Sequence, residues 1–532
     1  MKSIAIRTLT LAATLILAGP VNAYEHEDSP VNFVEYAEGV LEQHKDKKRP
    51  YFLLFSAQWC YWCKVFAERS LTRKEVFTYL NENYVNVFID ADIHNALYVR
   101  YRATGLPFTV FLNPDGSTHF KYGGTLYGED FLDVIRRIKS DVAQKVSIKT
   151  EDAAPAEYQP PAILDVRDLE AMRGDFKRSV QGGFDSEAHG FGKREKTVLP
   201  RTFLYMLNST KGSDREVAVR SVQQALSTAI DRIYDPVEGG FFRYAETRDW
   251  QIPHYEKMAD LNAGVVLLLY RLNKESASKK LQQAADKTLA YLTSSLYDSK
   301  TGSFLSFQEA DEHYYLLSAD GRKHAKKPLV IRKVFTDRLA GTINYLIDVL
   351  DYTSAPSLED KIKSSLEFLA TMILEGNGMR RYYSLSGNQW LGKSTLQDYA
   401  LVGHVFLKAA SRFNNSRYRD LARRSVQTAI DSFFDRDKQI FIDASFGLAD
   451  DIEYLMEMNG LLAQAMMRLD GEKPGEYAGL VKTLMTYFSH MDEVLEDQLW
   501  EANGWEFTER YVPYLEAVDD FLTRRTVAKS SE

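Results

Sequence analysis

The chain has very few cysteines: 532 residues contain only Cys60 and Cys63. A framework of structural disulfides is therefore excluded, although such frameworks are common in small exported domains. A zinc site is not expected either, because two further nitrogen or sulfur ligands would be needed beside this pair. The two cysteines have no second internal pair with which to exchange, so any redox partner must be another molecule.

The chain also lacks an excess of basic residues. The chain has 66 Lys and Arg against 74 Asp and Glu, for a formal net charge of −8. Because nucleic-acid binding requires a basic face, no nucleic-acid partner is expected. Hydrophobic residues make up 45% and charged residues 26%, which is ordinary globular composition. A chain of this length predicts at least two domains.

The first 23 residues have the pattern of a secretory signal peptide. Lys2 and Arg7 precede a short apolar stretch over residues 9–18, and small residues up to Ala23 form a cleavage pattern. We therefore expect export to a periplasm or to the outside, as a soluble protein. An uncleaved membrane anchor is the alternative, but the apolar stretch is short for a bilayer span. No long apolar run follows, so no span is expected after signal cleavage.

Residues 24–145 are predicted to form an α/β domain. An amphipathic helix is expected over residues 31–45 from the spacing of apolar residues. Short apolar runs predict buried strands. The expected strands are 51–56, 85–90, 108–112 and 118–122, and the further helices are 60–69, 73–82, 95–102 and 128–139. This alternation predicts a mixed sheet covered by helices.

A second, all-α domain is predicted beyond a linker. Residues 146–163 are rich in proline and acidic residues, residues 164–525 have helical periodicity, and residues 526–532 form a tail. Short loops recur between the helices, and they begin at Gly182, Asp235, Asp298 and Asp435. Their spacing leaves room for about six helical hairpins. An (α/α)6 toroid with these loops on one rim is therefore expected, and an irregular helical array is the alternative.

The two cysteines lie where thiol chemistry is favoured. Cys60 follows a predicted buried strand and opens a helix, whose N–H groups and dipole lower the pKa of a thiol. We expect Cys60 to be exposed and to attack a substrate disulfide, and Cys63 to resolve the mixed disulfide. Trp59 and Lys64 flank the pair as supporting residues, and Pro107 is well placed for a cis peptide bond against it. A redox-active disulfide is the expected cofactor, with no metal. A structural disulfide and a redox-inactive binding domain are the alternatives.

Three segments together resemble the thioredoxin superfamily: Trp59-Cys60-Tyr61-Trp62-Cys63-Lys64, Gly105-Leu106-Pro107 and Asn113-Pro114-Asp115-Gly116. The resemblance covers about residues 31–139 and is greatest to the C-terminal domain of DsbD and similar exported reductases. It implies thiol–disulfide exchange. In thioredoxin a buried aspartate six residues before the first cysteine accepts a proton from the resolving cysteine. Leu54 stands there in this chain, so another group or water must take that proton.

Nearly the whole mature chain is similar to the YyaL and spermatogenesis-associated thioredoxin-domain family. The segments that carry this resemblance are 235–262, 333–337 and 396–400, the first of which includes Pro253-His254-Tyr255-Glu256-Lys257-Met258. It implies a thioredoxin-like domain fused to a six-hairpin (α/α)6 domain, related in fold to glycosidases and N-acylglucosamine 2-epimerases. The chain departs from the family at Tyr61 and Lys64, where histidines are usual.

The helical part also contains candidate site residues. His254 and Glu256 could act as general acid and base, and Arg243 and Lys257 could hold an anionic group. Further side chains suited to stacking on or hydrogen-bonding a sugar or peptide are Tyr244, Trp250, Asp337, Trp390 and Asp398. A structural role in capping helices and cross-linking loops is the alternative.

These patterns predict an exported thiol–disulfide oxidoreductase that acts on a protein dithiol or disulfide. Its toroid would bind a partner, or a carbohydrate or peptide ligand. One alternative is a carbohydrate-active toroid, glycosidase-like or epimerase-like, with an accessory thioredoxin-like domain. Another is a scaffold that holds a client through a mixed disulfide without turnover. The direction of the redox reaction stays open.

Overall fold

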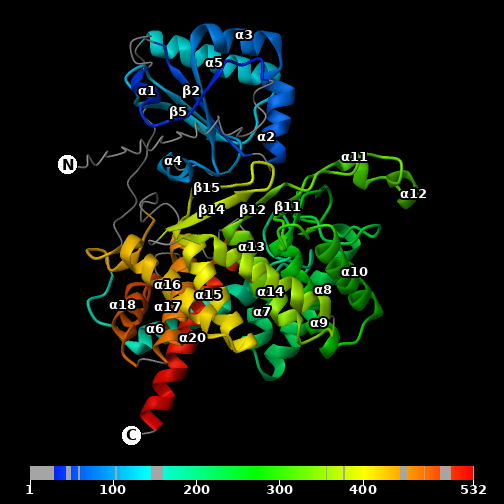
Figure 1. Cartoon of the computed structure of the whole chain (residues 1–532), viewed down its shortest axis with the longest axis vertical. Helices are drawn as coiled ribbons and strands as arrows, with labels where there is room; N and C mark the ends of the chain where they lie inside the picture. Colours follow the sequence, from blue (N-terminus) through cyan, green and yellow to red (C-terminus); the bar gives the residue numbers. More distant parts are fainter. Residues whose placement is uncertain are drawn as a thin grey trace, which may run out of the picture.

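The computed structural model describes residues 29–43, 49–57, 60–101, 103, 105–144, 160–354, 356–374, 378–443, 452–471, 474–491 and 505–530. An α/β domain ends with helix α5 (Gly128–Ala143), and a larger helical part begins with helix α6 (Val166–Gly182), as Figure 1 shows. The predicted signal peptide, Trp59 and most of the predicted linker lie outside the described residues. The domain limits given above therefore stay predictions.

The N-terminal domain is built on one sheet with the strand order β1–β3–β2–β4–β5. The strands are β1 (Phe33–Glu35), β2 (Tyr51–Ser56), β3 (Val85–Asp90), β4 (Phe108–Leu112) and β5 (Thr118–Gly123). Strands β1, β3 and β2 are parallel, and β4 and β5 are antiparallel to their neighbours. Every residue of β2, β3 and β4 is buried, because helices cover both faces of these apolar strands.

The helices of this domain divide between the two faces of the sheet. One face packs against α2 (Tyr61–Phe66), α3 (Lys74–Asn83) and α5, and the other against α1 (Val40–Gln43) and α4 (Asn95–Arg100). A π-helical turn, Ala67–Leu71, continues α2. This arrangement is the thioredoxin-like fold that the sequence predicts.

One predicted element of this domain is wrong. Residues 31–45 do not form a single helix, because Phe33–Glu35 pairs with β3 as an edge strand and α1 covers only four residues. The Phe33 ring contacts Phe52 and Phe88 across the sheet. The apolar residues whose spacing suggested a helix thus lie partly in an edge strand of the sheet. Gly39, at φ +85°, separates this strand from the short helix.

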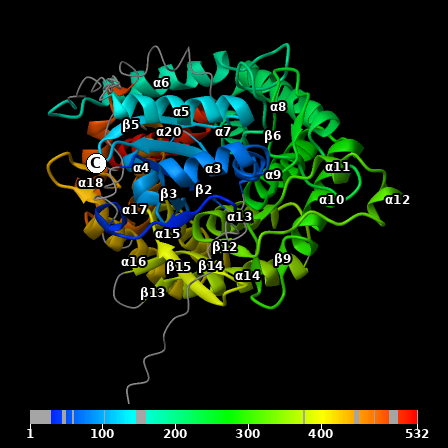
Figure 2. The same ribbon diagram turned by 90° about the horizontal axis from the view of Figure 1, so that it is seen from above.

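The helical part is a closed toroid. Within the described residues, its six inner helices are α7 (Pro200–Ser209), α9 (Ala259–Glu275), α13 (Thr336–Val349), α15 (Leu396–Phe413), α17 (Ile452–Asp470) and α20 (Trp505–Ser530). Each inner helix contacts the next, and α20 closes the ring against α7. The outer layer consists of α6, α8 (Gly212–Arg232), α10 (Lys279–Ser294), α14 (Pro356–Thr371), α16 (Ser416–Phe433) and α18 (Ala478–Tyr487). The predicted (α/α)6 toroid is confirmed, and Figure 2 views it through the N-terminal domain that lies over it.

A loop repeat joins the outer layer of the toroid to the inner layer. Four described loops contain an aromatic residue, then Asp, then Phe six residues after that Asp; these aspartates are Asp185, Asp235, Asp298 and Asp435. In each loop the two aromatic rings are in contact, with centroids 5.0–5.6 Å apart. The Asp side chain accepts backbone N–H groups of its own loop. The first copy starts at Asp185 rather than at Gly182, where the sequence analysis placed it.

All four loops lie on one rim, because each follows an outer helix and precedes the next inner helix. The same rim carries the strands β12 (Lys333–Phe335), β14 (Gly378–Ser384) and β15 (Gln389–Lys393), which lie below the N-terminal domain in Figure 1.

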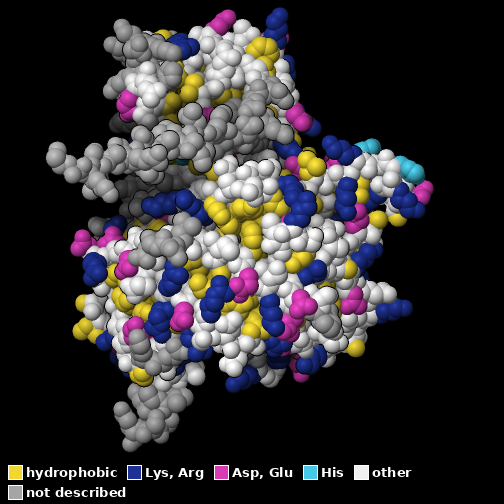
Figure 3. Space-filling model, viewed as in Figure 1, with side chains coloured by type: hydrophobic (Ala, Val, Ile, Leu, Met, Phe, Trp, Pro, Cys, Tyr) yellow, Lys and Arg dark blue, Asp and Glu magenta, His cyan; other side chains and the backbone are white. Residues whose placement is uncertain are grey.

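Across the described part of the chain, helices with the length and hydrophobicity of a membrane span do not occur. Acidic and basic side chains are interspersed over the toroid face in Figure 3.

Candidate functional site

Cys60 and Cys63 form a disulfide at the start of α2. Cys60 is the N-cap of this helix, and the backbone N–H of Cys63 donates a hydrogen bond to its sulfur over 3.1 Å. The free N–H groups and the dipole of a helix N-terminus favour negative charge. When the pair is reduced, this position therefore favours the thiolate of Cys60.

The prediction that Cys60 is exposed is wrong. The exposed fraction is 5% for Cys60 and 3% for Cys63. The two cysteines and Ala57 form a small apolar cluster against which Trp62 and Leu106 pack. The peptide bond between Leu106 and Pro107 is cis, as expected. The disulfide is thus covered by neighbours of its own domain, and one of them, Trp62, also contacts the toroid.

The two residues between the cysteines contact a toroid histidine. The ring of His254 is nearly parallel to the indole of Trp62, with an interplanar angle of 19° and centroids 6.2 Å apart. Tyr61 meets the same imidazole edge-on, with centroids 5.4 Å apart. Tyr244 stacks on His254, with ring centroids 4.7 Å apart. We call Tyr61, Trp62, Tyr244 and His254 the interface cluster.

Charged and apolar contacts surround the interface cluster. The ammonium of Lys64 pairs with the carboxylate of Glu309, and Asp92 lies 3.6 Å from Lys333 with both side chains 8% exposed. Ile93 packs against an apolar group of the toroid that includes Phe335. The N-terminal domain is therefore docked on the toroid through the end that carries its cysteines.

His254 and Glu256 lie next to each other in a buried setting. The two side chains are 3.8 Å apart, and Arg243 donates a hydrogen bond of 2.9 Å to Glu256. Burial, together with the nearby guanidinium of Arg243, lowers the pKa of His254 to about 3. Burial also raises the pKa of Glu256, although the Arg243 guanidinium opposes this. An imidazole with so low a pKa is uncharged near neutrality and is a poor general acid there.

Lys257 is too deeply buried in the toroid to bind an anionic ligand from solution. Its ammonium is fully buried, 2.7 Å from the carboxylate of Asp235 and 2.8 Å from the carbonyl oxygen of Gly239. It also lies over the rings of Tyr291 and Tyr315. This position suits a cross-link of the loop that begins at Asp235.

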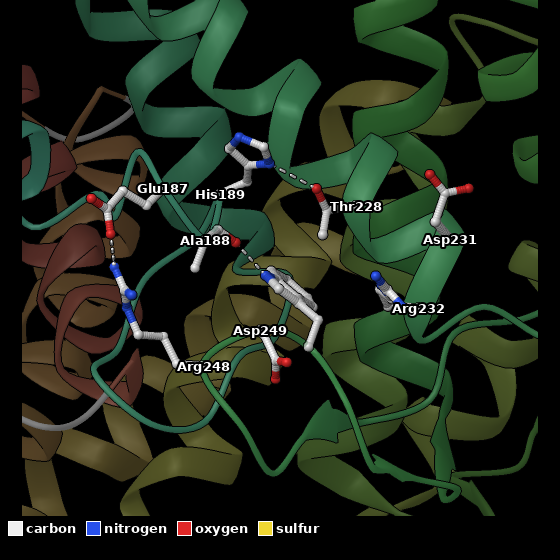
Figure 4. A pocket seen from close by; sticks show the side chains of 9 residues that line it. Glu187, Ala188, His189, Thr228, Asp231, Arg232, Arg248 and Asp249 are labelled. Carbon is white, nitrogen blue, oxygen red and sulfur yellow. Dashed lines mark hydrogen bonds and ion pairs between the residues drawn. The ribbon is translucent and has the colours of Figure 1, made fainter.

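Trp250 and Trp390 lie apart from the interface cluster. Trp250 is buried and donates its indole N–H to the carbonyl oxygen of Ala188 over 2.6 Å. It lines a surface pocket of about 640 Å³ together with His189 and Thr228, whose side chains are hydrogen-bonded to each other (Figure 4). Trp390 lies on β15 and packs against Tyr383.

Asp337 and Asp398 belong to a chain of ion pairs that links three inner helices. Arg381 is 2.6 Å from Asp398 and 3.1 Å from Asp337. Arg338 is 3.8 Å from Asp337 and 2.8 Å from Asp260. Burial raises the pKa of Asp398 to about 6. Burial would raise the pKa of Asp337 too, but Arg381 and Arg338 hold it below its usual value.

A central cavity of about 230 Å³ opens among the N-terminal ends of the inner helices. Arg243 and Asp337 line it, as does a charged group that the sequence analysis missed: Arg201, Asp260, Arg338, Glu457 and Glu509. Arg201 pairs with Glu457, and its backbone N–H donates to Glu509 over 3.0 Å. These residues could have been found from the sequence, because each is a charged residue near the start of an inner helix. The starts of the inner helices share one rim, so their charged side chains meet there.

The comparisons with known proteins agree with this architecture. Residues 17–153 match the family model Thioredox_DsbH, described as a protein of unknown function, DUF255. Spermatogenesis-associated protein 20 of Rattus norvegicus is 27% identical over 322 residues, which cover 54% of this chain and 40% of the relative. The uncharacterized protein B0495.5 of Caenorhabditis elegans is 24% identical over 373 residues, or 64% of this chain and 50% of the relative. The matches thus span half or less of these relatives.

Among solved structures, D-mannose isomerase is similar with a TM-score of 0.51 and 13% identity, covering 69% of this chain and 100% of that chain. At this identity the likeness shows the toroid fold alone. The fold and the comparisons define a class of protein in which a thioredoxin-like domain is fused to an (α/α)6 toroid. Within that class, the family model over residues 17–153 and the similarity to spermatogenesis-associated protein 20 support the thioredoxin-domain family that the sequence predicts.

Proposed function

We propose that the chain is a thiol–disulfide oxidoreductase that exchanges disulfides with a partner molecule through Cys60 and Cys63. The observation that carries this proposal is the disulfide at the N-terminus of α2, where the N–H of Cys63 bonds the sulfur of Cys60. A helix N-terminus is a setting that activates a thiolate. Cys63 lies one turn later, within reach of the sulfur that it must attack.

The exchange requires no group beyond the two thiols. The thiolate of Cys60 attacks one sulfur of a partner disulfide, which forms a mixed disulfide and releases one partner thiolate. The thiolate of Cys63 then attacks the sulfur of Cys60, which closes the internal disulfide and releases the second partner thiolate. The partner gains two electrons and the cysteine pair loses two. The same steps in reverse oxidise a partner dithiol.

The docked arrangement restricts which partners can reach the pair. Cys60 is 5% exposed, and Trp62, which packs against it, lies on His254 of the toroid. A folded partner therefore needs the N-terminal domain to lift from the toroid, whereas a small thiol needs only a local movement. In this proposal the toroid controls access to the disulfide and binds the partner or its ligand.

The first experiment measures turnover of a disulfide substrate by the full chain in the presence of a dithiol donor. Cys60→Ser should abolish turnover, because it removes the attacking sulfur. Cys63→Ser should instead accumulate a mixed disulfide with the partner, since the resolving step is lost. Full turnover by Cys60→Ser would overturn the proposal. Accumulation of clients without any turnover by the wild type would favour the scaffold alternative.

We also propose that the protein works outside the cytosol. The support is the signal-like pattern of residues 1–23. Fractionation of cells that express the full chain should place it outside the cytosol, with a new N-terminus after Ala23. A chain that keeps Met1 and stays in the cytosol would contradict this part.

A carbohydrate-active toroid is the second candidate, and the central cavity is its specific site. The cavity carboxylates Glu457 and Glu509 already accept charge-assisted or backbone hydrogen bonds from Arg201. Such engaged carboxylates fit a structural role better than general acid–base work. A thermal-shift screen with monosaccharides and oligosaccharides tests this candidate, and a shift that Glu457→Gln abolishes would support it.

A further inference from the structure

The toroid contributes a side chain to the immediate surroundings of the disulfide. Trp62 packs against the cluster that contains both cysteines, and it also contacts the imidazole of His254. Tyr61, the remaining residue between the cysteines, meets the same imidazole. Both residues between the two cysteines therefore contact His254.

His254 is held in place from within the toroid. It lies on β7 (Pro253–His254), which pairs with β6 (Tyr244–Ala245), so Tyr244 and His254 are direct partners across two strands. Tyr244 stacks on the imidazole, and the carboxylate of Glu256 lies 3.8 Å from Nε2. Arg243 fixes that carboxylate in turn. The imidazole is thus a rigid surface for Trp62.

We propose that His254 is a positioning residue of the thiol–disulfide site, which holds Trp62 against Cys60 and Cys63 and thereby favours the disulfide over the dithiol. This inference rests on the proposed function. Reduction adds two electrons and two protons and breaks the bond between the sulfurs, which then move apart. Tyr61 and Trp62 connect the cysteines, and both contact His254 in the structure that has the disulfide closed. By linkage, a contact that is stronger in one state shifts the equilibrium toward that state.

Packing rather than charge carries the effect. A charged imidazolium beside the pair would stabilise the thiolate of Cys60 and favour the dithiol. Burial keeps His254 uncharged near neutrality. An aromatic ring without ionisable nitrogen should therefore replace His254 in this role, whereas a methyl group should not.

The test equilibrates the full chain with glutathione buffers and quantifies the dithiol by thiol trapping. His254→Ala should shift the equilibrium toward the dithiol by about tenfold, or about 30 mV for two electrons. Tyr244→Ala should shift it in the same direction, and His254→Phe should stay within about twofold of the wild type. The matched control is His189→Ala, because His189 is a toroid histidine that contacts Thr228 rather than the interface cluster.

Two outcomes overturn the inference in distinguishable ways. If the wild-type pair cycles and His254→Ala has the same equilibrium, the inference is wrong and the proposed function stands. If the pair does not cycle in any variant, the proposed function fails and the inference fails with it. If His254→Ala does not fold, Tyr244→Ala and His254→Phe provide the test. An unchanged equilibrium in Tyr244→Ala would overturn the inference. A loss of the disulfide preference in His254→Phe would overturn the packing argument and assign the effect to the imidazole itself.

Discussion

Lys64, the residue after the resolving cysteine, forms an ion pair with Glu309 of the toroid, 245 positions away in the sequence. The sequence places Lys64 beside the disulfide as a supporting residue. The structure directs its ammonium away from the N-terminal domain and into the domain interface. The pair therefore ties the start of α2 to the toroid, and its strength contributes to how often the domains separate.

Charge reversal at this pair should speed reduction of the disulfide by a protein dithiol. Glu309→Lys and Lys64→Glu should each raise the rate about two- to fivefold, since partly exposed ion pairs contribute up to about 1 kcal/mol. The double variant should return toward the wild-type rate because the attraction is restored. Stopped-flow measurement of the dithiol product gives the rate.

The matched control is Arg73→Glu, which breaks an ion pair with Glu129 inside the N-terminal domain. Its rate should equal that of the wild type. A double variant that is as fast as the two single changes combined would show that the Lys64–Glu309 contact does not hold the domains together.

Acid should weaken docking of the N-terminal domain through His254. In the docked protein burial lowers the pKa of His254 to about 3, whereas an exposed histidine has a pKa near 6.5. Below about pH 6.5, His254 becomes protonated in the separated form but stays neutral in the docked form, so docking weakens as the pH falls. Between pH 7 and pH 5 the loss is at most about 2 kcal/mol, because Tyr244 and Arg243 stay beside His254 in the separated form. Small-angle scattering at both pH values measures the fraction of separated domains.

His254→Phe provides the control for this pH dependence, because phenylalanine does not titrate. Its docking should change less between pH 7 and pH 5 than that of the wild type. Burial raises the pKa of Asp90 to about 6, so the contribution of Asp90 is lost as the pH rises through 6, which is the opposite sign. Both proteins share Asp90, so their difference isolates His254. An equal change in both would contradict the prediction.

Asn262 should be a stability determinant of the toroid. Its side chain accepts the N–H of Phe241 over 2.6 Å and donates to the carbonyl oxygens of Phe241 and Met258. Asn459 makes the equivalent bonds to Phe441. Asn262→Ala leaves buried backbone groups unpaired and should cost about 3 kcal/mol in urea unfolding.

The exposed Gln283→Ala on α10 serves as the control and should lie within about 0.5 kcal/mol of the wild type. If Asn262→Ala is equally neutral, the loop repeat does not depend on this side chain.

Lys257→Met should separate a structural role from ligand binding. Removal of the ammonium leaves the carbonyl oxygen of Gly239 without its partner, while Asp235 keeps its bonds to Arg322. We expect a loss of about 2 kcal/mol in urea unfolding with an unchanged reduction potential of the cysteine pair. Unaltered stability together with a lost ligand would return Lys257 to the anion-binding role that the sequence suggests.

The fold could be predicted from the sequence where local patterns decide it. The apolar runs of β2, β3 and β4 are strands because each is short, buried and bounded by turns. The edge strand β1 was missed because three residues carry too little periodicity to outweigh a helical pattern around them.

The candidate site could be predicted only in part. The cysteine pair follows from its position after β2, but Trp62, which packs on the pair, is in turn in contact with His254 of the other domain. No sequence pattern links two such residues. Arg201, Glu457 and Glu509 were missed for a similar reason, since each comes from a different helix and they meet only when the ring closes.

Closure of the toroid has a consequence for how it unfolds. The last helix of the ring, α20, packs against α17, α7 and α6, and Asp519 of α20 is 2.9 Å from Arg173 of α6. In an open solenoid, terminal repeats can melt one at a time because each contacts a single neighbour. In a closed ring every hairpin has two neighbours, so the loss of one exposes two apolar faces at once. The toroid should therefore melt as a single cooperative unit, and partly unwound forms should be scarce.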